Sequence, residues 1–327
     1  EGKYYVWSYE ELKKLLGDDF VLFEKKYEIS NIGNFEGKNI LVETKNELNE
    51  EEQNKILNIE DKLIQERKKR IKPFFDDKSQ TDLNAFIIDT LISTSIILDD
   101  DNLKYEAIKT LELLNNKLSN KIYHCYDSSE IDAFLEDYVY YAMLLVTLYE
   151  VNGDESSLAK AITIMKEIWE IFYNKDAQLL QKNKIKDNDL FASPIDLNDS
   201  NIPNGNSVYL NLCNKIYIIT NDKFWFDKVE ILKKSFHQVL NSFFSQMFSF
   251  IKTLDLCENS VSFTFFGSKD SIKDIKLNLQ KNYLGRATFV YKNNKEKETY
   301  VVICKNQTCS EKLKDLSEVK NYLENRI

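Results

Sequence analysis

An acidic pair, Glu136 and Asp137, lies in the first turns of a long apolar segment and is followed by Tyr138. A carboxylate inside an apolar helix is costly to bury alone, so both groups should reach a polar cavity or a partner. Two carboxylates around one substrate can act as general acid and general base. The alternative is structural: Asp137 alone points inward and accepts hydrogen bonds from backbone groups. We predict Glu136 and Asp137 as catalytic residues and Tyr138 as a substrate-binding residue.

Asp76, Asp77 and Lys78 stand just before another apolar segment, which carries Asn84 near its start. Acidic groups beside a helix N-terminus are stabilised as anions by the helix dipole. This position suits a nucleophile or a metal ligand better than a proton donor. The alternative is that these residues cap the helix and pair with upstream arginines. We predict Asp77 as catalytic and Asp76, Lys78 and Asn84 as substrate-binding.

A third polar group, Asp199 with Asn206 and Ser207, precedes or opens a third apolar segment. Gly205 permits a tight turn there, and Asn206 or Ser207 can cap the following helix. Capping alone could account for this string. Three segments that each bring polar residues to the same end nevertheless predict one shared site, in which Asp199, Asn206 and Ser207 bind substrate.

The histidines and cysteines give weaker evidence for a catalytic or metal-binding site. His124 and His237 fall outside these three groups, so histidine-based acid–base chemistry is not expected. Cys304 and Cys309 lack the two further ligands that zinc needs, and a packing role is expected for Cys304. The five cysteines are odd in number and scattered, which fits reduced thiols in a cytoplasmic protein. We therefore predict no metal. We also predict no cofactor, and the strand–helix segment after Cys257 has no glycine-rich loop for a nucleotide.

The net charge and the lengths of the apolar runs limit the classes of partner that we expect for this chain. A net charge of −9 repels a phosphate backbone, so nucleic acid is not expected as a partner. No apolar run reaches the roughly 20 residues that a membrane-spanning helix needs, and no membrane partner is predicted. No signal peptide is visible in the sequence, which begins at Glu1 and not at a methionine.

The apolar pattern predicts helical hairpins. Segments that are apolar on nearly every side alternate with segments that have one apolar face, and the former should be buried inside the latter. The first kind covers residues 81–98, 131–149 and 207–219, and the second kind covers 103–118, 158–172 and 224–240. An inner ring of helices wrapped by an outer ring requires this alternation. The count falls short of a six-hairpin toroid, so we predict a mainly α, partial (α/α)6 toroid whose other hairpins lie upstream.

The hydrophobic periodicity changes after Cys257, from helical to mixed strand and helix. Residues 260–266 alternate as a strand, 271–281 are helical, 287–291 and 299–304 are strand-like, and 310–325 form a closing helix. We therefore predict two domains, the toroid over residues 1–257 and a small α/β unit over residues 258–327.

Six unusual strings occur in a fixed order: EGKYYVW from Glu1, GNFEGKNIL from Gly33, DDK from Asp76, LEDY from Leu135, PNGNS from Pro203 and CKNQTC from Cys304. In these strings the chain resembles the C-terminal part of the thioredoxin-domain-containing family that includes spermatogenesis-associated protein 20. The resemblance implies an α/α toroid like those of N-acylglucosamine 2-epimerases and six-hairpin glycosidases, with a thioredoxin-like domain upstream. Where the family has Trp and Gly after DDK, this chain has Leu83 and Ala85, which puts ligand stacking there in doubt.

Two functions are compatible with this resemblance. The first is a carbohydrate-active domain, hydrolase- or epimerase-like, or a sugar-binding domain, whose cavity holds the three polar groups. The second is a non-catalytic scaffold that presents substrates or partners to the thioredoxin-like domain. A cavity lined by carboxylates and aromatic rings favours the first function, and a cavity plugged by side chains favours the second.

Overall fold

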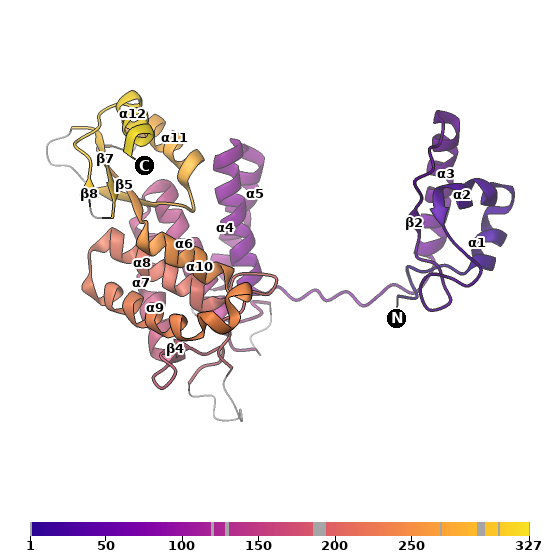
Figure 1. Ribbon diagram of the computed structural model, residues 1–327, viewed down its shortest axis with the longest axis horizontal. Coiled ribbons are helices and arrows are strands. Elements are labelled where there is room, and N and C mark those ends of the chain that lie inside the picture. The colour runs from indigo at the N-terminus through magenta and orange to yellow at the C-terminus, as the bar shows by residue number, and fades with distance from the viewer. Residues whose placement is uncertain are drawn as a thin grey trace. The chain divides into compact units, whose positions relative to one another are not determined.

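The computed structural model describes residues 2–118, 121–127, 131–185, 194–268, 270–292, 298–306 and 308–326. The chain divides into two compact units, residues Glu1–Asp77 and Lys78–Ile327 (Figure 1). The sequence pattern did not predict this division. The α/β segment at the C-terminus belongs to the same unit as the hairpins, and a domain boundary after residue 257 stays a prediction.

The first unit is a small helical module. It contains α1 (Tyr9–Leu16), η1 (Gly17–Asp19), α2 (Phe20–Lys26), β1 (Tyr27–Glu28), β2 (Val42–Glu43) and α3 (Glu50–Lys68), with β1 and β2 antiparallel. Ser8 and Asn49 open α1 and α3 with capping boxes. Trp7 and Phe23 are buried in its core, and the Arg70 guanidinium lies 3.8 Å from the Trp7 ring centroid.

The second unit is built from helical hairpins (Figure 1). Its helices are α4 (Thr81–Leu98), α5 (Asp101–Lys117), α6 (Leu135–Asn152), α7 (Glu155–Phe172), α8 (Gly205–Thr220), α9 (Lys223–Phe243) and α10 (Phe248–Glu258). Three consecutive pairs form the hairpins α4–α5, α6–α7 and α8–α9, and α4, α6, α8 and α10 pack side by side in that order. This succession of inner helices backed by outer helices is the predicted partial toroid, and the mainly α fold with a small α/β part is confirmed.

A repeated turn joins each inner helix to its outer partner. The inner helices end at Asp99, Gly153 and Asn221, all with left-handed backbone. The residue that follows is an aspartate each time, and its side chain caps the outer helix. A left-handed residue stops one helix and a capping carboxylate starts the next, so the chain reverses within two residues.

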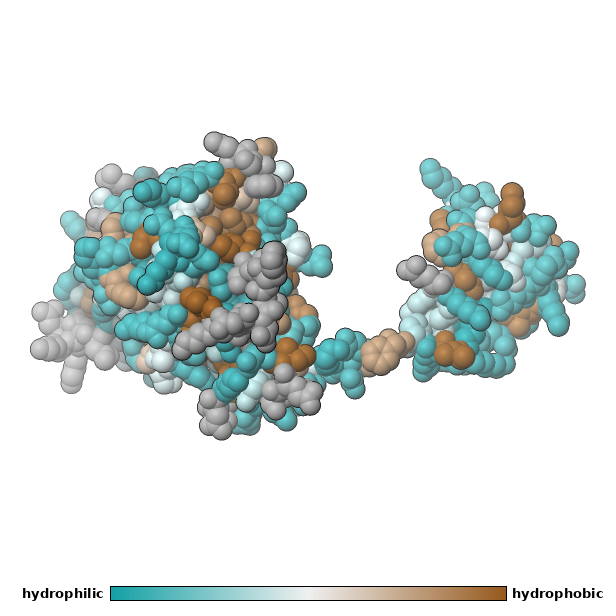
Figure 2. Space-filling model, turned by 90° about the horizontal axis from the view of Figure 1, so that it is seen from below, coloured by the Kyte–Doolittle hydropathy of each residue, from teal (hydrophilic) through white to brown (hydrophobic). Residues whose placement is uncertain are grey.

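The inner helices are not equally buried. Most of α6 is buried on all sides, with Tyr140, Tyr141 and Tyr149 in the core. In contrast, α4 exposes Ile87 and Leu98, so the expectation that this helix is buried all round is wrong. Figure 2 shows apolar side chains, in brown, gathered in patches among hydrophilic ones on the larger unit. Among the described residues α4 is the one helix long and apolar enough to cross a membrane by length and composition, and the absence of a membrane partner stays a prediction.

The C-terminal α/β part comprises β5 (Val261–Phe266), α11 (Lys273–Tyr283), β6 (Thr288–Lys292), β7 (Tyr300–Lys305), β8 (Thr308–Cys309) and α12 (Leu316–Arg326). The sheet order is β6-β5-β7-β8, with β5 parallel to β6 and antiparallel to β7. Two smaller strands, β3 (Tyr173–Asn174) and β4 (Leu179–Leu180), pair after α7, and η2 (Phe244–Gln246) follows α9. The Tyr291 hydroxyl donates to the Glu150 carbonyl oxygen at 2.7 Å and fastens the sheet to α6.

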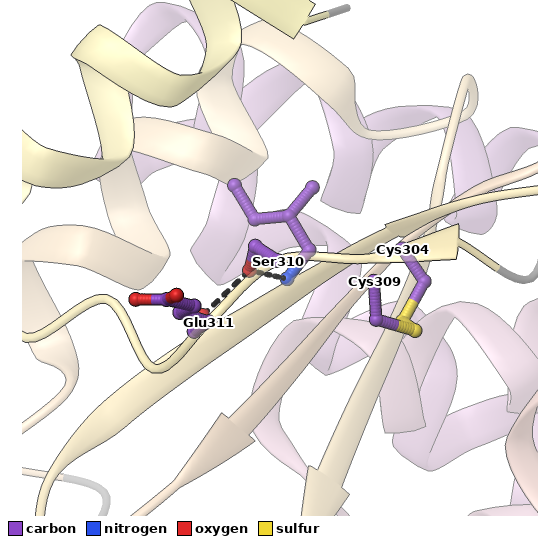
Figure 3. The surroundings of a disulfide bond; sticks show 5 residues. Cys304, Cys309, Ser310 and Glu311 are labelled. Carbon is purple, nitrogen blue, oxygen red and sulfur yellow. Dashed lines mark hydrogen bonds between the residues drawn. A yellow bond between two sulfur atoms is a disulfide. The ribbon is translucent and has the colours of Figure 1, made fainter.

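Two of the cysteines form a disulfide, which corrects the expectation of reduced thiols. Cys304 on β7 and Cys309 on β8 are direct cross-strand partners and are covalently joined (Figure 3). Beside them, the Ser310 hydroxyl accepts the Ile303 N–H at 3.0 Å. The spacing of these cysteines gave no hint that their strands would pair so closely. Cys125, Cys213 and Cys257 are not part of a disulfide.

Candidate functional site

The inner helices α4, α6 and α8 begin around one polar pocket. We call it the mouth pocket; its volume is about 290 Å³, and its lining includes Gln80, Asp82, His124, Phe134, Glu136, Lys182, Asp196, Asn198, Pro203 and Asn204. Gln80, Phe134 and Asn204 are the N-cap residues of the three helices. Three helix N-termini at one opening favour negative charge in the pocket, because the helix dipoles point there.

Asp137 is fully buried at the base of this region. Its carboxylate accepts the backbone N–H of Asp82 at 3.1 Å and that of Phe134 at 2.8 Å. It thereby ties the start of α4 to the start of α6. Burial raises the pKa of Asp137, while the Phe134 N–H and the His124 ring oppose the rise.

His124 is the second partner of Asp137. The His124 Nδ1 lies 3.1 Å from Asp137 Oδ2, and the other ring nitrogen, Nε2, lies 3.1 Å from the Gln80 side-chain nitrogen. A protonated Nδ1 that donates to the carboxylate and an Nε2 that accepts from Gln80 satisfy both contacts. The imidazole is therefore oriented by a carboxylate, as in a general base whose free nitrogen faces the substrate.

Glu136 differs from its neighbour. Its Oε2 is buried and has no hydrogen-bond partner in the described part of the chain. Burial raises the pKa of Glu136, opposed by its own backbone N–H and by Lys182 and reinforced by Asp196 and Asp82. A Cβ on Gly205 would lie 3.0 Å from Glu136 Oε1, so the glycine lets α8 begin against this carboxyl group.

Asp82, His124 and Asp137 also have ligand atoms within 4.8 Å of one another, close enough to hold a metal ion. However, the Asp137 oxygens already accept two backbone N–H groups and stand opposite His124 Nδ1. Binding an ion would require the imidazole Nδ1 to turn from donor to ligand. The hydrogen-bond pattern therefore favours a carboxylate–imidazole pair over a metal site.

The group ahead of α4 is placed differently from its prediction. Asp76, Asp77 and Lys78 are exposed in the segment without helix or strand that precedes α4, and they do not line the mouth pocket. Asn84 donates to the Gln80 carbonyl oxygen one turn earlier in its own helix at 2.7 Å. Tyr138 is buried, packs on Phe172 of α7, and likewise does not line the pocket.

The group at the start of α8 has structural contacts. The Asp199 carboxylate accepts the Asn204 N–H at 3.0 Å and the Ser249 N–H at 2.6 Å, which joins the loop to α10. Asn206 is fully buried and exchanges two hydrogen bonds of 2.8 Å with the backbone of Leu180 on β4. Ser207 does not line the mouth pocket; it lines a second cavity between α4, α6, α8 and α10.

Of the ten predicted site residues, the structure thus places Glu136 in the pocket wall and Asp137 directly behind it. Sequence reasoning missed His124, Asp82 and Asp196, which come from two loops and the first turn of α4. Asp82 was detectable as an acidic residue in the first turn of an apolar helix. No pattern in the sequence marks His124, because its partner lies 13 residues away across a loop.

The fold and the mouth pocket together define a partial α/α toroid domain with an acidic pocket at one end. No family model matches the sequence. The chain is homologous to spermatogenesis-associated protein 20 of Mus musculus, with 24% identity in an alignment 324 positions long that covers 86% of this chain and 41% of that protein. The Homo sapiens protein of the same name is 24% identical over 285 residues, covering 73% of this chain and 36% of that protein. These relatives confirm the resemblance seen in the sequence, and the chain spans about two fifths of their length.

Solved structures give a weaker likeness. The GH76A alpha-1,6-mannanase of Salegentibacter sp. has a TM-score of 0.38 and 14% identity, covering 56% of this chain and 54% of that one. An inactive variant of that enzyme in complex with alpha-1,6-mannotriose also has a TM-score of 0.38, with 15% identity over 57% of this chain and 54% of that one. At this TM-score the likeness supports no inference about ligand or reaction in this chain.

Proposed function

We propose that this domain is carbohydrate-active and that its mouth pocket performs acid–base chemistry on a sugar, with Glu136 as the proton donor. The observation that carries the proposal is the buried, unpartnered Glu136 Oε2 in the wall of a polar pocket. Burial raises the pKa of Glu136, which favours the protonated form that a general acid needs.

A base is available across the same pocket. The Asp137 carboxylate orients His124, and Nε2 becomes free to take a proton when a substrate hydroxyl or water displaces the Gln80 amide. In hydrolysis, the glycosidic C–O bond breaks as the leaving oxygen takes the Glu136 proton. A water oxygen bonds to the anomeric carbon and gives its proton to His124. Asp82 and Asp196 add negative charge that stabilises a cationic sugar in the transition state.

The test compares two kinds of glycoside on the wild type and on Glu136→Gln. Substrates with poor leaving groups need the acid, and their kcat/KM should fall by about 10²–10⁴-fold. Aryl glycosides with good leaving groups need little protonation, and their kcat/KM should fall much less. Glu170→Gln, an exposed change on α7, serves as the matched control. Equal losses for both kinds of glycoside, or no turnover of any glycoside by the wild type, would refute the proposed role.

A non-catalytic scaffold is the second candidate, and Asp137 is the observation that favours it. Its carboxylate holds the starts of two hairpins together, which a scaffold requires as much as an enzyme does. In that case the domain presents partners to a thioredoxin-like domain upstream, as the family resemblance implies. A cytoplasmic location belongs to both versions of the proposal. Binding of a thioredoxin-like domain without any glycoside turnover would support the scaffold.

A further inference from the structure

A second cavity lies between the inner helices α4, α6, α8 and α10 of the hairpin unit. We call it the inner cavity; its volume is about 320 Å³, and only Pro203 is shared with the mouth pocket. Its polar lining comprises Asp89, Ser93, Thr147, Glu150, Ser207, Asn211, Lys215, Ser249, Lys252 and Thr253. Thr147, Glu150, Ser207 and Thr253 are buried, and buried polar groups are costly unless they have partners.

Two of these side chains have buried polar atoms without a partner. Ser207 is fully buried, and its Oγ makes no hydrogen bond in the described part of the chain. The Asp89 Oδ1 atom is also buried and also makes no hydrogen bond among the described residues. An unsatisfied buried polar group costs the fold about 1–3 kcal/mol, so both atoms are expected to have a partner that is not a side chain of this unit.

The charges in the inner cavity are balanced. Lys215 Nζ lies 2.6 Å from the Glu150 carboxylate, and Glu150 is almost completely buried. The second Glu150 oxygen accepts the Phe289 N–H of β6 at 3.2 Å, so this ion pair is held rigidly. The remaining two charged residues, Asp89 and Lys252, have opposite signs. A strongly charged ligand would leave one of these groups unpaired, which favours a neutral ligand.

We propose that the inner cavity binds a neutral polyhydroxylated molecule of monosaccharide size. Asp89 Oδ1 and Ser207 Oγ would receive and donate hydrogen bonds to its hydroxyl groups, and Lys215 retains ammonium protons not used by Glu150. Phe86 and Met143 give the cavity an apolar wall for the carbon face of such a ligand. The volume is at the lower end of the range of small-molecule sites, which suits one sugar ring or a linear polyol. The inference uses none of the proposed acid–base residues and does not depend on their reaction.

The experiment measures binding of hexoses, inositol and linear polyols by isothermal titration calorimetry and saturation-transfer NMR. Asp89→Asn preserves the shape but replaces the carboxylate, and Ser207→Ala removes the hydroxyl. Each change should weaken binding at least tenfold. The control is Glu136→Gln in the mouth pocket, which should leave this binding unchanged. Ser93→Leu provides a second route, because it fills the cavity and should abolish binding even if Asp89→Asn unfolds the protein.

Two outcomes would overturn the proposal. One is that no polyol in the panel binds, in which case ordered water satisfies Asp89 and Ser207. The other is that binding is lost in Glu136→Gln and retained in Asp89→Asn and Ser93→Leu, which would place the ligand in the mouth pocket. This second outcome would leave the proposed acid–base site intact, so the two proposals fail separately.

Discussion

Asp89→Asn should stabilise the folded protein at neutral pH. Burial raises the pKa of Asp89 from its ordinary 3.8 to about 6, while the Thr147 hydroxyl and the Lys215 ammonium oppose the rise. The ionised form therefore costs the native state free energy that the unfolded state does not lose. Asparagine keeps the shape and removes the charge, so the variant escapes this cost.

The size of the stabilisation by Asp89→Asn, and the pH range in which it develops, follow from the pKa of Asp89. Each tenfold change in proton affinity is worth about 1.4 kcal/mol, so a rise from 3.8 to about 6 penalises the ionised native state by up to about 3 kcal/mol. Because the native pKa is raised, the native state binds more protons between these two values, and stability is lost as pH rises through about 6. The variant does not titrate there. The difference in unfolding free energy should be near zero at pH 4 and reach its full value above pH 7.

Urea unfolding of both proteins at several values between pH 4 and pH 8 measures this difference, with equal m-values as the check that the two unfold alike. Sugars and polyols are left out of the buffers, since a bound ligand would add its own stabilisation. A variant that is less stable than the wild type at pH 8, or a difference that does not change with pH, would refute the argument that Asp89 is buried at a cost.

Three further outcomes are expected. Asp137→Asn leaves buried N–H donors facing an amide N–H and should cost about 1–3 kcal/mol of stability by urea unfolding; an unchanged midpoint would contradict its bridging role. Glu150→Gln leaves Lys215 buried without its counter-charge and should cost about 3–5 kcal/mol, whereas breaking an exposed lysine–glutamate pair on α3 should cost under about 1 kcal/mol. Replacing Cys304 and Cys309 together by serine should cost about 2 kcal/mol under non-reducing conditions, and a reductant should abolish the difference between variant and wild type.

The sequence predicted the hairpins because the apolar pattern separates inner from outer helices. The structure adds a second feature, because each hairpin turn has a left-handed residue followed by a capping aspartate, as in Gly153 and Asp154. Burial of α4 was overestimated for a physical reason. An apolar pattern indicates which residues are stabilised by burial, but it does not indicate whether a neighbouring element covers them. Ile87 and Leu98 remain exposed on this helix.

The candidate site was predicted only where a local rule applied. Glu136 and Asp137 were found because acids in an apolar helix violate the usual pattern, whereas His124 lies on a loop and becomes meaningful only through its contact with Asp137. The disulfide between Cys304 and Cys309 was missed because it depends on the pairing of β7 with β8. Both contacts are short in sequence, 13 and 5 residues, but loop and turn geometry of this kind leaves no periodicity in the sequence.

The two adjacent acids show why burial cost alone cannot identify a catalytic residue. The cost of burying Asp137 is offset by backbone N–H donors at the starts of two helices and by His124. Its carboxylate therefore connects the elements around the pocket. Glu136 has no such donors at Oε2 and meets the same cost by a raised pKa. A carboxylate that already accepts hydrogen bonds can orient a neighbouring side chain, whereas a protonated carboxyl group can act as a proton donor. The sequence predicted both acids as catalytic residues. These contacts favour Glu136 as the proposed proton donor and a positioning role beside His124 for Asp137.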